Sequence, residues 1–176
     1  MLSLRKLIIK TPTTEYKPHD SVRGIFVHTL HGLMKDYDKF VVIVGDLGYG
    51  MFDRIREDYP ERFFNVGASE QAMVDIAVGM ALSGKTPIVY TITPFLVYRP
   101  YESIINYIYK EGLRVKLIGS GMDDDYKEDG PSHWFYGYEH VPLMIEQIMT
   151  RRDAKRKGYI EGMLKDFYPR LILLKR

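Results

Sequence analysis

Hydrophobic residues recur at intervals of three and four over residues 22–37, which is the spacing of an amphipathic helix. This pattern follows Asp20-Ser21, a suitable helix N-cap. We predict a second helix over residues 69–83, which Ser69 caps and which ends at Gly84, a typical helix stop. Because almost all positions of this second helix are apolar or small, we expect it to be buried on most sides.

Short runs rich in branched apolar residues separate the helical patterns and are typical of strands buried on both faces. We predict strands at residues 40–44, 62–66, 87–91, 114–118 and 171–174. We predict further helices at residues 52–58, from Pro100 through Ile104, Ile105 and Ile108, over Val141, Met144, Ile145, Ile148 and Met149, and near residues 159–166. Alternating strands and helices predict an α/β fold, a doubly wound and mainly parallel sheet with helices on both faces.

Composition narrows the class of protein. We assign residues 20–176 to one α/β domain and residues 1–19 to an N-terminal segment, since 176 residues with 45% hydrophobic content fit a single core. The chain has no cysteine, which excludes disulfides and a thiol nucleophile. A net charge of +2 gives no general attraction to nucleic acid. No apolar run approaches the roughly 18 residues of a membrane span and no signal-peptide pattern is present, so we expect a cytoplasmic protein without membrane contacts.

Unusual residues gather at the predicted carboxyl ends of the strands, where doubly wound sheets bind ligands. Glu70 opens the apolar second helix after a Gly-Ala-Ser turn. It is either a helix-start acid favoured by the helix dipole or an acid that binds a ligand. Burial at this position favours the neutral carboxyl group, which suits proton transfer. Asp46 lies between Gly45 and Gly48 after the first buried strand, and it is either a turn residue or a site residue.

Two later segments carry further candidates. Phe95, Tyr98 and Tyr101 repeat at three-residue spacing, which fits either a core stripe or rings that stack on a heterocycle. A tight turn begins at Asp129 and ends at His133, which has the most distinctive setting of the five histidines. This turn is either a plain surface turn or part of a site.

Other patterns argue against metal, phosphate and nucleic-acid sites in this chain. The run Asp123-Asp124-Asp125 lacks the spacing of a calcium loop, so we interpret it as a solvated turn and predict no metal ligands. Residues 45–50 (GDLGYG) form neither a Walker loop nor a Rossmann fingerprint. The basic stretch 151–157 is typical of a solvated face or a partner contact.

Together these segments resemble the pyrimidine-binding domain of the transketolase family of thiamine diphosphate enzymes. The matching segments occur in the family's order, and the resemblance covers about residues 20–174. The specific segment is residues 62–71 (RFFNVGASEQ). The others are residues 45–48 (GDLG), 77–84 (AVGMALSG), 93–99 (TPFLVYR) and 128–133 (EDGPSH).

The resemblance implies that Glu70 is catalytic. It would hydrogen-bond a ring nitrogen of the cofactor's aminopyrimidine and so help to activate the cofactor. It also implies an aromatic wall for the pyrimidine, in which Tyr98 stacks on the ring beside Phe95 and Tyr101. Tyr98 replaces the more usual Phe, and Arg99 with Pro100 are uncommon choices, which leaves substrate specificity open.

The resemblance also assigns residues to the other parts of the ligands. Asp46 and Leu47 fall where the family contacts the thiazolium side of the cofactor across a subunit interface. Asp129 and His133 fall where the hydroxyl groups of a donor sugar are bound, and His133 is implied to be catalytic as well.

The chain departs from the family in one respect that limits its activity. The family binds the diphosphate and Mg²⁺ in another domain, through Gly-Asp-Gly and a distant Asn, whereas Leu47 follows Gly45-Asp46 here. The resemblance therefore implies a shared thiamine diphosphate site, with Mg²⁺ bound by a separate diphosphate-binding subunit in a homo- or hetero-oligomer.

Two-carbon ketol transfer from a sugar or sugar phosphate, or a related carboligation, is the reaction that the resemblance implies. Two alternatives remain open. The chain is either a non-catalytic assembly or binding module that keeps this fold, or part of a lyase or decarboxylase that uses the same cofactor.

Overall fold

The structure is a computed structural model and describes residues 19–122, 124–136 and 145–175. Its centre is a six-stranded sheet in which all neighbouring strands are parallel. The strands are β1 Phe40–Val44, β2 Phe63–Asn65, β3 Thr86–Ile92, β4 Lys116–Ser120, β5 Ile145–Met149 and β6 Arg170–Leu174. The predicted α/β class and the doubly wound parallel sheet are confirmed.

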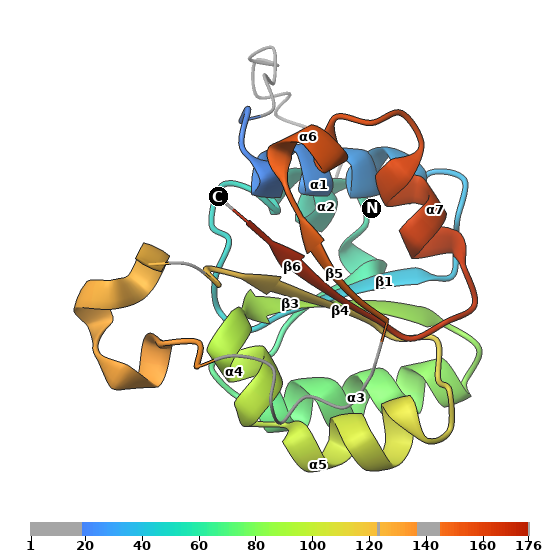
Figure 1. Cartoon of the computed structure of the whole chain (residues 1–176). Coiled ribbons are helices and arrows are strands. Elements are labelled where there is room, and N and C mark those ends of the chain that lie inside the picture. The colour runs from blue at the N-terminus through green and yellow to red at the C-terminus, as the bar shows by residue number, and fades with distance from the viewer. Residues whose placement is uncertain (1–18, 123, 137–144, 176) are drawn as a thin grey trace, which may run out of the picture.

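Helices cover both faces of the sheet (Figure 1). The helices are α1 Val22–Leu33, α2 Asp53–Asp58, α3 Glu70–Leu82, α4 Thr93–Tyr98, α5 Tyr101–Ser103, α6 Arg151–Ala154 and α7 Tyr159–Lys165. A π-helix, Ile104–Tyr109, continues α5, and 3₁₀ turns lie at Pro60–Arg62, Asp124–Asp129 and Pro131–His133. One face carries α1, α2, α6 and α7, and the other carries α3, α4 and α5.

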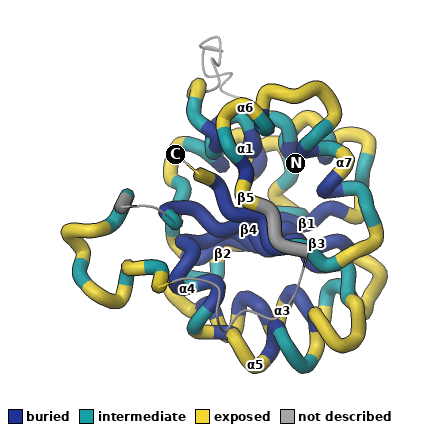
Figure 2. The backbone as a smooth tube through the Cα atoms, viewed as in Figure 1, coloured by how far each residue is buried: buried dark blue, intermediate teal, exposed yellow. Residues whose placement is uncertain are grey.

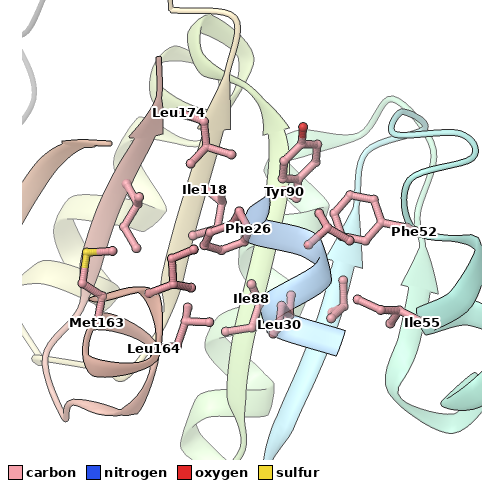
Figure 3. Close-up of a cluster of buried hydrophobic side chains, with 14 of the residues drawn as sticks. Phe26, Leu30, Phe52, Ile55, Ile88, Tyr90, Ile118, Met163, Leu164 and Leu174 are labelled. Atoms are coloured by element: carbon pink, nitrogen blue, oxygen red, sulfur yellow. The ribbon is translucent and has the colours of Figure 1, made fainter. Parts of the chain in front are cut away.

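Each face of the sheet has its own hydrophobic core. On the first face, Phe26 and Leu30 of α1 pack with Tyr90 of β3 (Figure 3). On the second face, Met73 of α3 packs in a cluster with Val89 of the same strand. Successive residues of a strand point to opposite faces, so a strand with a core on each side is apolar throughout. This double burial accounts for the continuous hydrophobic runs in the sequence (Figure 2).

The strand order, β2-β1-β3-β4-β6-β5, determines where ligands can bind. The chain moves outward from β1 to β2 and then returns to the other side of β1 as β3, so the direction of winding reverses between β1 and β3. Val44 lies opposite both Asn65 in β2 and Tyr90 in β3. The connections that carry Asp46, Glu70 and α4 therefore meet at this reversal, the usual ligand position in such sheets.

Several predicted elements need correction. The helix predicted over residues 141–149 is wrong, because Ile145–Met149 forms strand β5 and pairs with β6. Val141 and Met144 of that prediction lie outside the described residues. The first helix ends at Leu33 rather than at residue 37.

The expectation that α3 is buried on most sides is also wrong. Its inner face, with Met73 and Val74, is buried, but 41% of Ile76 and 72% of Leu82 are exposed on the outer face. Among the described residues, no helix is long and apolar enough to cross a lipid bilayer.

A charge cluster around the buried Lys116 lies at the amino-terminal edge of the sheet, opposite the carboxyl ends of the strands. The Lys116 ammonium donates to the Asp166 carboxylate at 2.5 Å and to the carbonyl oxygens of Asp166 and Tyr168 at 3.0 and 2.7 Å. Arg170 pairs with the same carboxylate. Burial lowers the pKa of Lys116 to about 8, although the hydrogen bond to Asp166 opposes that shift. These contacts join β4 and β6 to the end of α7.

Candidate functional site

Glu70 is the first residue of α3 and a buried carboxylate, with 2% of its side chain exposed. Oε2 lies 2.5 Å from Nη1 of Arg99, and Oε1 lies 3.4 Å from the Thr91 hydroxyl. A Cβ atom at Gly45 would lie 3.2 Å from the Thr91 hydroxyl and 3.5 Å from Oε1, so glycine allows β1 to end close to the carboxylate. Among the described residues, Glu70 is the one buried acid.

The turn before α3 is held by Asn65, which the sequence analysis did not single out. Its Oδ1 accepts hydrogen bonds from the backbone N–H groups of Gly67 at 3.0 Å and Asp46 at 3.1 Å. Gly67 has a φ of 71°, which a residue without a side chain adopts readily. Asn65 therefore connects the end of β1 to the turn that positions Glu70.

Asp46 follows β1 on the exposed edge with an unusual φ of 55°. Its carboxylate accepts hydrogen bonds from the Tyr49 hydroxyl and, at 3.3 Å, from the Asn65 amide. The Tyr49 hydrogen bond, followed by that of Asn65, lowers the pKa of Asp46 below its ordinary value. Leu47 beside it is half-buried and packs against the core on the α1 face.

The aromatic segment forms a helix, α4, despite the prolines at both of its ends. Phe95 is half-buried, and its ring lies beneath the guanidinium of Arg99, with Cζ 3.4 Å from the ring centroid. The Tyr98 hydroxyl accepts a hydrogen bond from the backbone N–H of Tyr136 at 2.8 Å. Tyr101 follows in α5 and is more exposed. The three predicted rings therefore lie along one short segment, and of these Tyr98 packs against the second core and contacts Tyr136.

His133 lies against this aromatic segment, whereas Asp129 does not contact it in any described interaction. The His133 ring is 4.8 Å from the ring of Phe95 and 6.2 Å from that of Tyr126, and its Nδ1 lies 3.0 Å from the Ser132 hydroxyl. Asp129 is exposed on the arm of 3₁₀ turns that extends from the body of the domain (Figures 1 and 2). The structure thus brings together Glu70, Phe95 and His133 and leaves Asp129 farther out on the arm.

Arg99 joins these predicted residues, and the sequence analysis treated it only as an uncommon choice. It contacts Glu70 on one side and Phe95 on the other. The sequence signal was weak, because Arg99 and Glu70 are 29 positions apart and no local pattern links them. Only the spacing of four between Phe95 and Arg99 predicts their contact, and only if the segment is helical.

A separate cavity of about 570 Å³ lies between the start of α1, at Ser21 and Arg23, and the turn of residues 48–51. It shares no lining residue with the surroundings of Glu70. The buried Glu70 carboxylate, paired with Arg99, is the more informative feature, since hollow volume alone does not identify chemistry. Among the described residues, no group of three or more His, Asp or Glu side chains could hold a metal ion.

The strand order and the position of Glu70 define the class of protein. It is a doubly wound α/β domain with a candidate ligand site at the reversal of its sheet. Residues 20–145 match the family described as "Transketolase, pyrimidine binding domain". The chain belongs to this family, whose members depend on thiamine diphosphate, and the predicted resemblance is confirmed.

Individual relatives agree with this assignment. The chain is 34% identical over 116 residues to the "Putative transketolase C-terminal section" of Methanocaldococcus jannaschii, covering 65% of this chain and 37% of that protein. It is 36% identical over 132 residues to the 1-deoxy-D-xylulose-5-phosphate synthase of Dehalococcoides mccartyi, covering 74% of this chain and 20% of that protein.

A solved structure described as "Split gene transketolase, inactive beta4 tetramer" is similar with a TM-score of 0.70 and 25% identity, covering 88% of this chain and 51% of that chain. The chain therefore spans about half or less of the length of each of these three relatives.

Proposed function

We propose that this chain is the pyrimidine-binding part of a split transketolase-like enzyme that depends on thiamine diphosphate. The observation that carries the proposal is the buried Glu70 carboxylate at the start of α3, at the reversal of the sheet. Two-carbon ketol transfer from a sugar or sugar phosphate, or a related carboligation, is the proposed reaction. The named relatives, a transketolase section and a synthase, support this reaction class.

The residues present fit the pyrimidine half of the cofactor. A buried carboxylate can accept a hydrogen bond from a ring N–H, and a protonated carboxyl group can donate its own proton, and we propose this role for Glu70. The rings of Phe95, Tyr98 and Tyr101 offer apolar faces for a planar heterocycle. When bound, the cofactor supplies the electron sink for cleavage and formation of carbon–carbon bonds. Asp46 and Leu47 are proposed to contact its thiazolium side.

The residues present do not fit the diphosphate half. The described residues contain no candidate metal cluster, and the sequence has no Gly-Asp-Gly motif. We therefore propose that another polypeptide binds the diphosphate and Mg²⁺ and completes the site. Asp129 and His133 are proposed to bind sugar hydroxyls, with His133 close enough to Phe95 to act beside the pyrimidine site.

Reconstitution tests this proposal. The chain is purified together with a polypeptide that carries the missing diphosphate-binding domain, and thiamine diphosphate-dependent turnover of sugar phosphates is measured. Glu70→Gln should reduce kcat at least about a hundredfold, because the amide can no longer exchange a proton with the ring nitrogen. Glu57→Gln, a matched change of an exposed acid in α2, should leave turnover unchanged. Unchanged turnover in Glu70→Gln would contradict the proposed role.

A non-catalytic assembly module is the second candidate. A solved relative favours it, since that protein is described as "Split gene transketolase, inactive beta4 tetramer". This candidate predicts a stable complex with the partner polypeptide but no cofactor-dependent turnover. Co-purification together with the activity assay distinguishes the two candidates.

A further inference from the structure

Arg99 covers the carboxylate of Glu70. Its Nη1 lies 2.5 Å from Oε2, while the Thr91 hydroxyl lies on the side of Oε1. Only 2% of the Glu70 side chain is exposed, against 41% of the Arg99 side chain, so the guanidinium lies between the carboxylate and solvent. We propose that Arg99 is a cap that closes Glu70 to ligands in the chain alone and must move before Glu70 can bind one.

The position of Arg99 allows such a movement. Arg99 directly follows α4, where the helix dipole favours a cation, and its Cζ lies 3.4 Å from the centroid of the Phe95 ring. Because the side chain is partly exposed, rotation about its own bonds can carry the guanidinium into water without a change of the backbone. Glu70 has no such freedom, since it is buried at the start of α3.

The cap also occupies the carboxylate oxygen that a ligand would contact. Oε2 of Glu70 lies 2.5 Å from Nη1 of Arg99, so a ring nitrogen cannot contact this oxygen while the guanidinium is in place. Given the function proposed above, on which this step depends, the capped chain is the resting form of the site. Completion of the site would then require the displacement of Arg99.

The alternative to a cap is that Arg99 and Glu70 form a purely structural ion pair. Stability measurements do not separate these two possibilities. Removing Arg99 leaves a buried carboxylate without its cation, which is destabilising in both cases. The two differ in the reactivity of Glu70. If Arg99 is the cap, its removal opens Glu70 to reagents in solution, whereas in the alternative the surrounding core still shields the carboxylate.

Carbodiimide coupling of an amine to carboxyl groups measures this reactivity in the folded, full-length chain. The extent of coupling at Glu70 is followed by peptide mass spectrometry at mildly acidic pH. In Arg99→Gln we expect labelling of Glu70 to be faster by about tenfold or more. This factor corresponds to the protection that one charge-assisted hydrogen bond gives and that the substitution removes. Arg56→Gln, which breaks the exposed 3.1 Å pair with Asp53, should leave the labelling of Glu70 unchanged.

Equal labelling of Glu70 in Arg99→Gln and the wild-type chain would overturn the proposal. Arg99→Lys provides a second variant if Arg99→Gln does not fold, because it keeps the charge but loses the planar group that covers Phe95 and Glu70. In that variant, labelling faster than wild type supports the cap and labelling at the wild-type rate overturns it. The experiment needs neither cofactor nor partner, so its failure is distinguishable from a failure of the turnover assay.

Discussion

Asp46 shows at the residue scale how backbone and side chain act together at the end of β1. Its φ of 55° is left-handed, a conformation that Asn and Asp adopt more readily than other residues with side chains. Its carboxylate is also engaged by Tyr49 and Asn65. The position therefore combines a backbone cost with a local hydrogen-bonding gain.

A series of three substitutions separates these two contributions. Asp46→Asn should have almost the thermal midpoint of the wild type, because Asn tolerates the conformation and can still accept a hydrogen bond. Asp46→Gly should lower the midpoint through the lost hydrogen bonds, and Asp46→Ala should lower it by a few degrees more, through added backbone strain. Circular dichroism melts give the order of the thermal midpoints. An Ala variant as stable as the Gly variant would contradict the proposed backbone strain at this position.

Residue chemistry also marks the limit of what the sequence could predict about the site. Glu70 and Phe95 were identified because an acid before an apolar helix and rings after a strand are local patterns. The role of Arg99 was not predicted, because its contact with Glu70 depends on how the ends of β2 and β3 lie on either side of β1. No pattern within either segment contains that information.

At the scale of elements, the Lys116 cluster predicts how stability depends on pH. Lys116 has a folded-state pKa of about 8 and an ordinary value of 10.5. Between these values the unfolded chain holds a proton that the folded chain has lost, so raising the pH across this window stabilises the fold. Relative to Lys116→Met, the wild-type chain should gain up to about 1.4 kcal/mol of unfolding free energy per pH unit there.

Urea denaturation of both proteins at several pH values between neutrality and 10.5 measures this difference. Lys110→Met serves as the matched control, because the Lys110 side chain is exposed and hydrogen-bonds only Asn106 among the described contacts. Its difference from the wild type should not vary with pH. A difference in unfolding free energy between Lys116→Met and the wild type that does not vary with pH would contradict the prediction. It would show that Lys116 titrates alike in the folded and the unfolded chain.

The strands with a core on each side were predicted correctly, whereas β5 was predicted as a helix. The reason is that its apolar pattern is ambiguous. The apolar positions at Ile145, Ile148 and Met149 fit the period of a helix and also a short buried strand. Thr150 exchanges hydrogen bonds with Asp153 in a capping box, so a helix starts after Thr150 instead of ending there. Pairing with β6, a long-range contact, decides the outcome.

At the scale of the whole molecule, several large apolar side chains of the described residues are exposed, and two places among them concern assembly. One is the outer face of α3, with Ile76 and Leu82. The other is the segment that follows the last 3₁₀ turn, where Trp134 and Tyr136 are exposed. Exposed apolar surface of this kind is typical of sites for protein–protein contact. Glu70 is the first residue of α3, and Tyr136 contacts Tyr98 of α4, so both places lie on segments connected with the candidate site. We therefore expect a partner that completes the site to cover them.

The outer face of α3 gives the sharpest test of assembly. We expect the chain alone to self-associate in sedimentation experiments and the double variant Ile76→Glu/Leu82→Glu to shift it to a monomer, because two charges would be buried in the contact. The free energy of unfolding, measured at low concentration, should change little, since both side chains are exposed in the domain. Tyr168→Ser, which removes an exposed ring at the amino-terminal edge, should leave the oligomer intact.

A wild-type chain that stays monomeric at high concentration would exclude the homo-oligomer but not a separate partner. In that case the same double variant should weaken co-purification with the diphosphate-binding polypeptide.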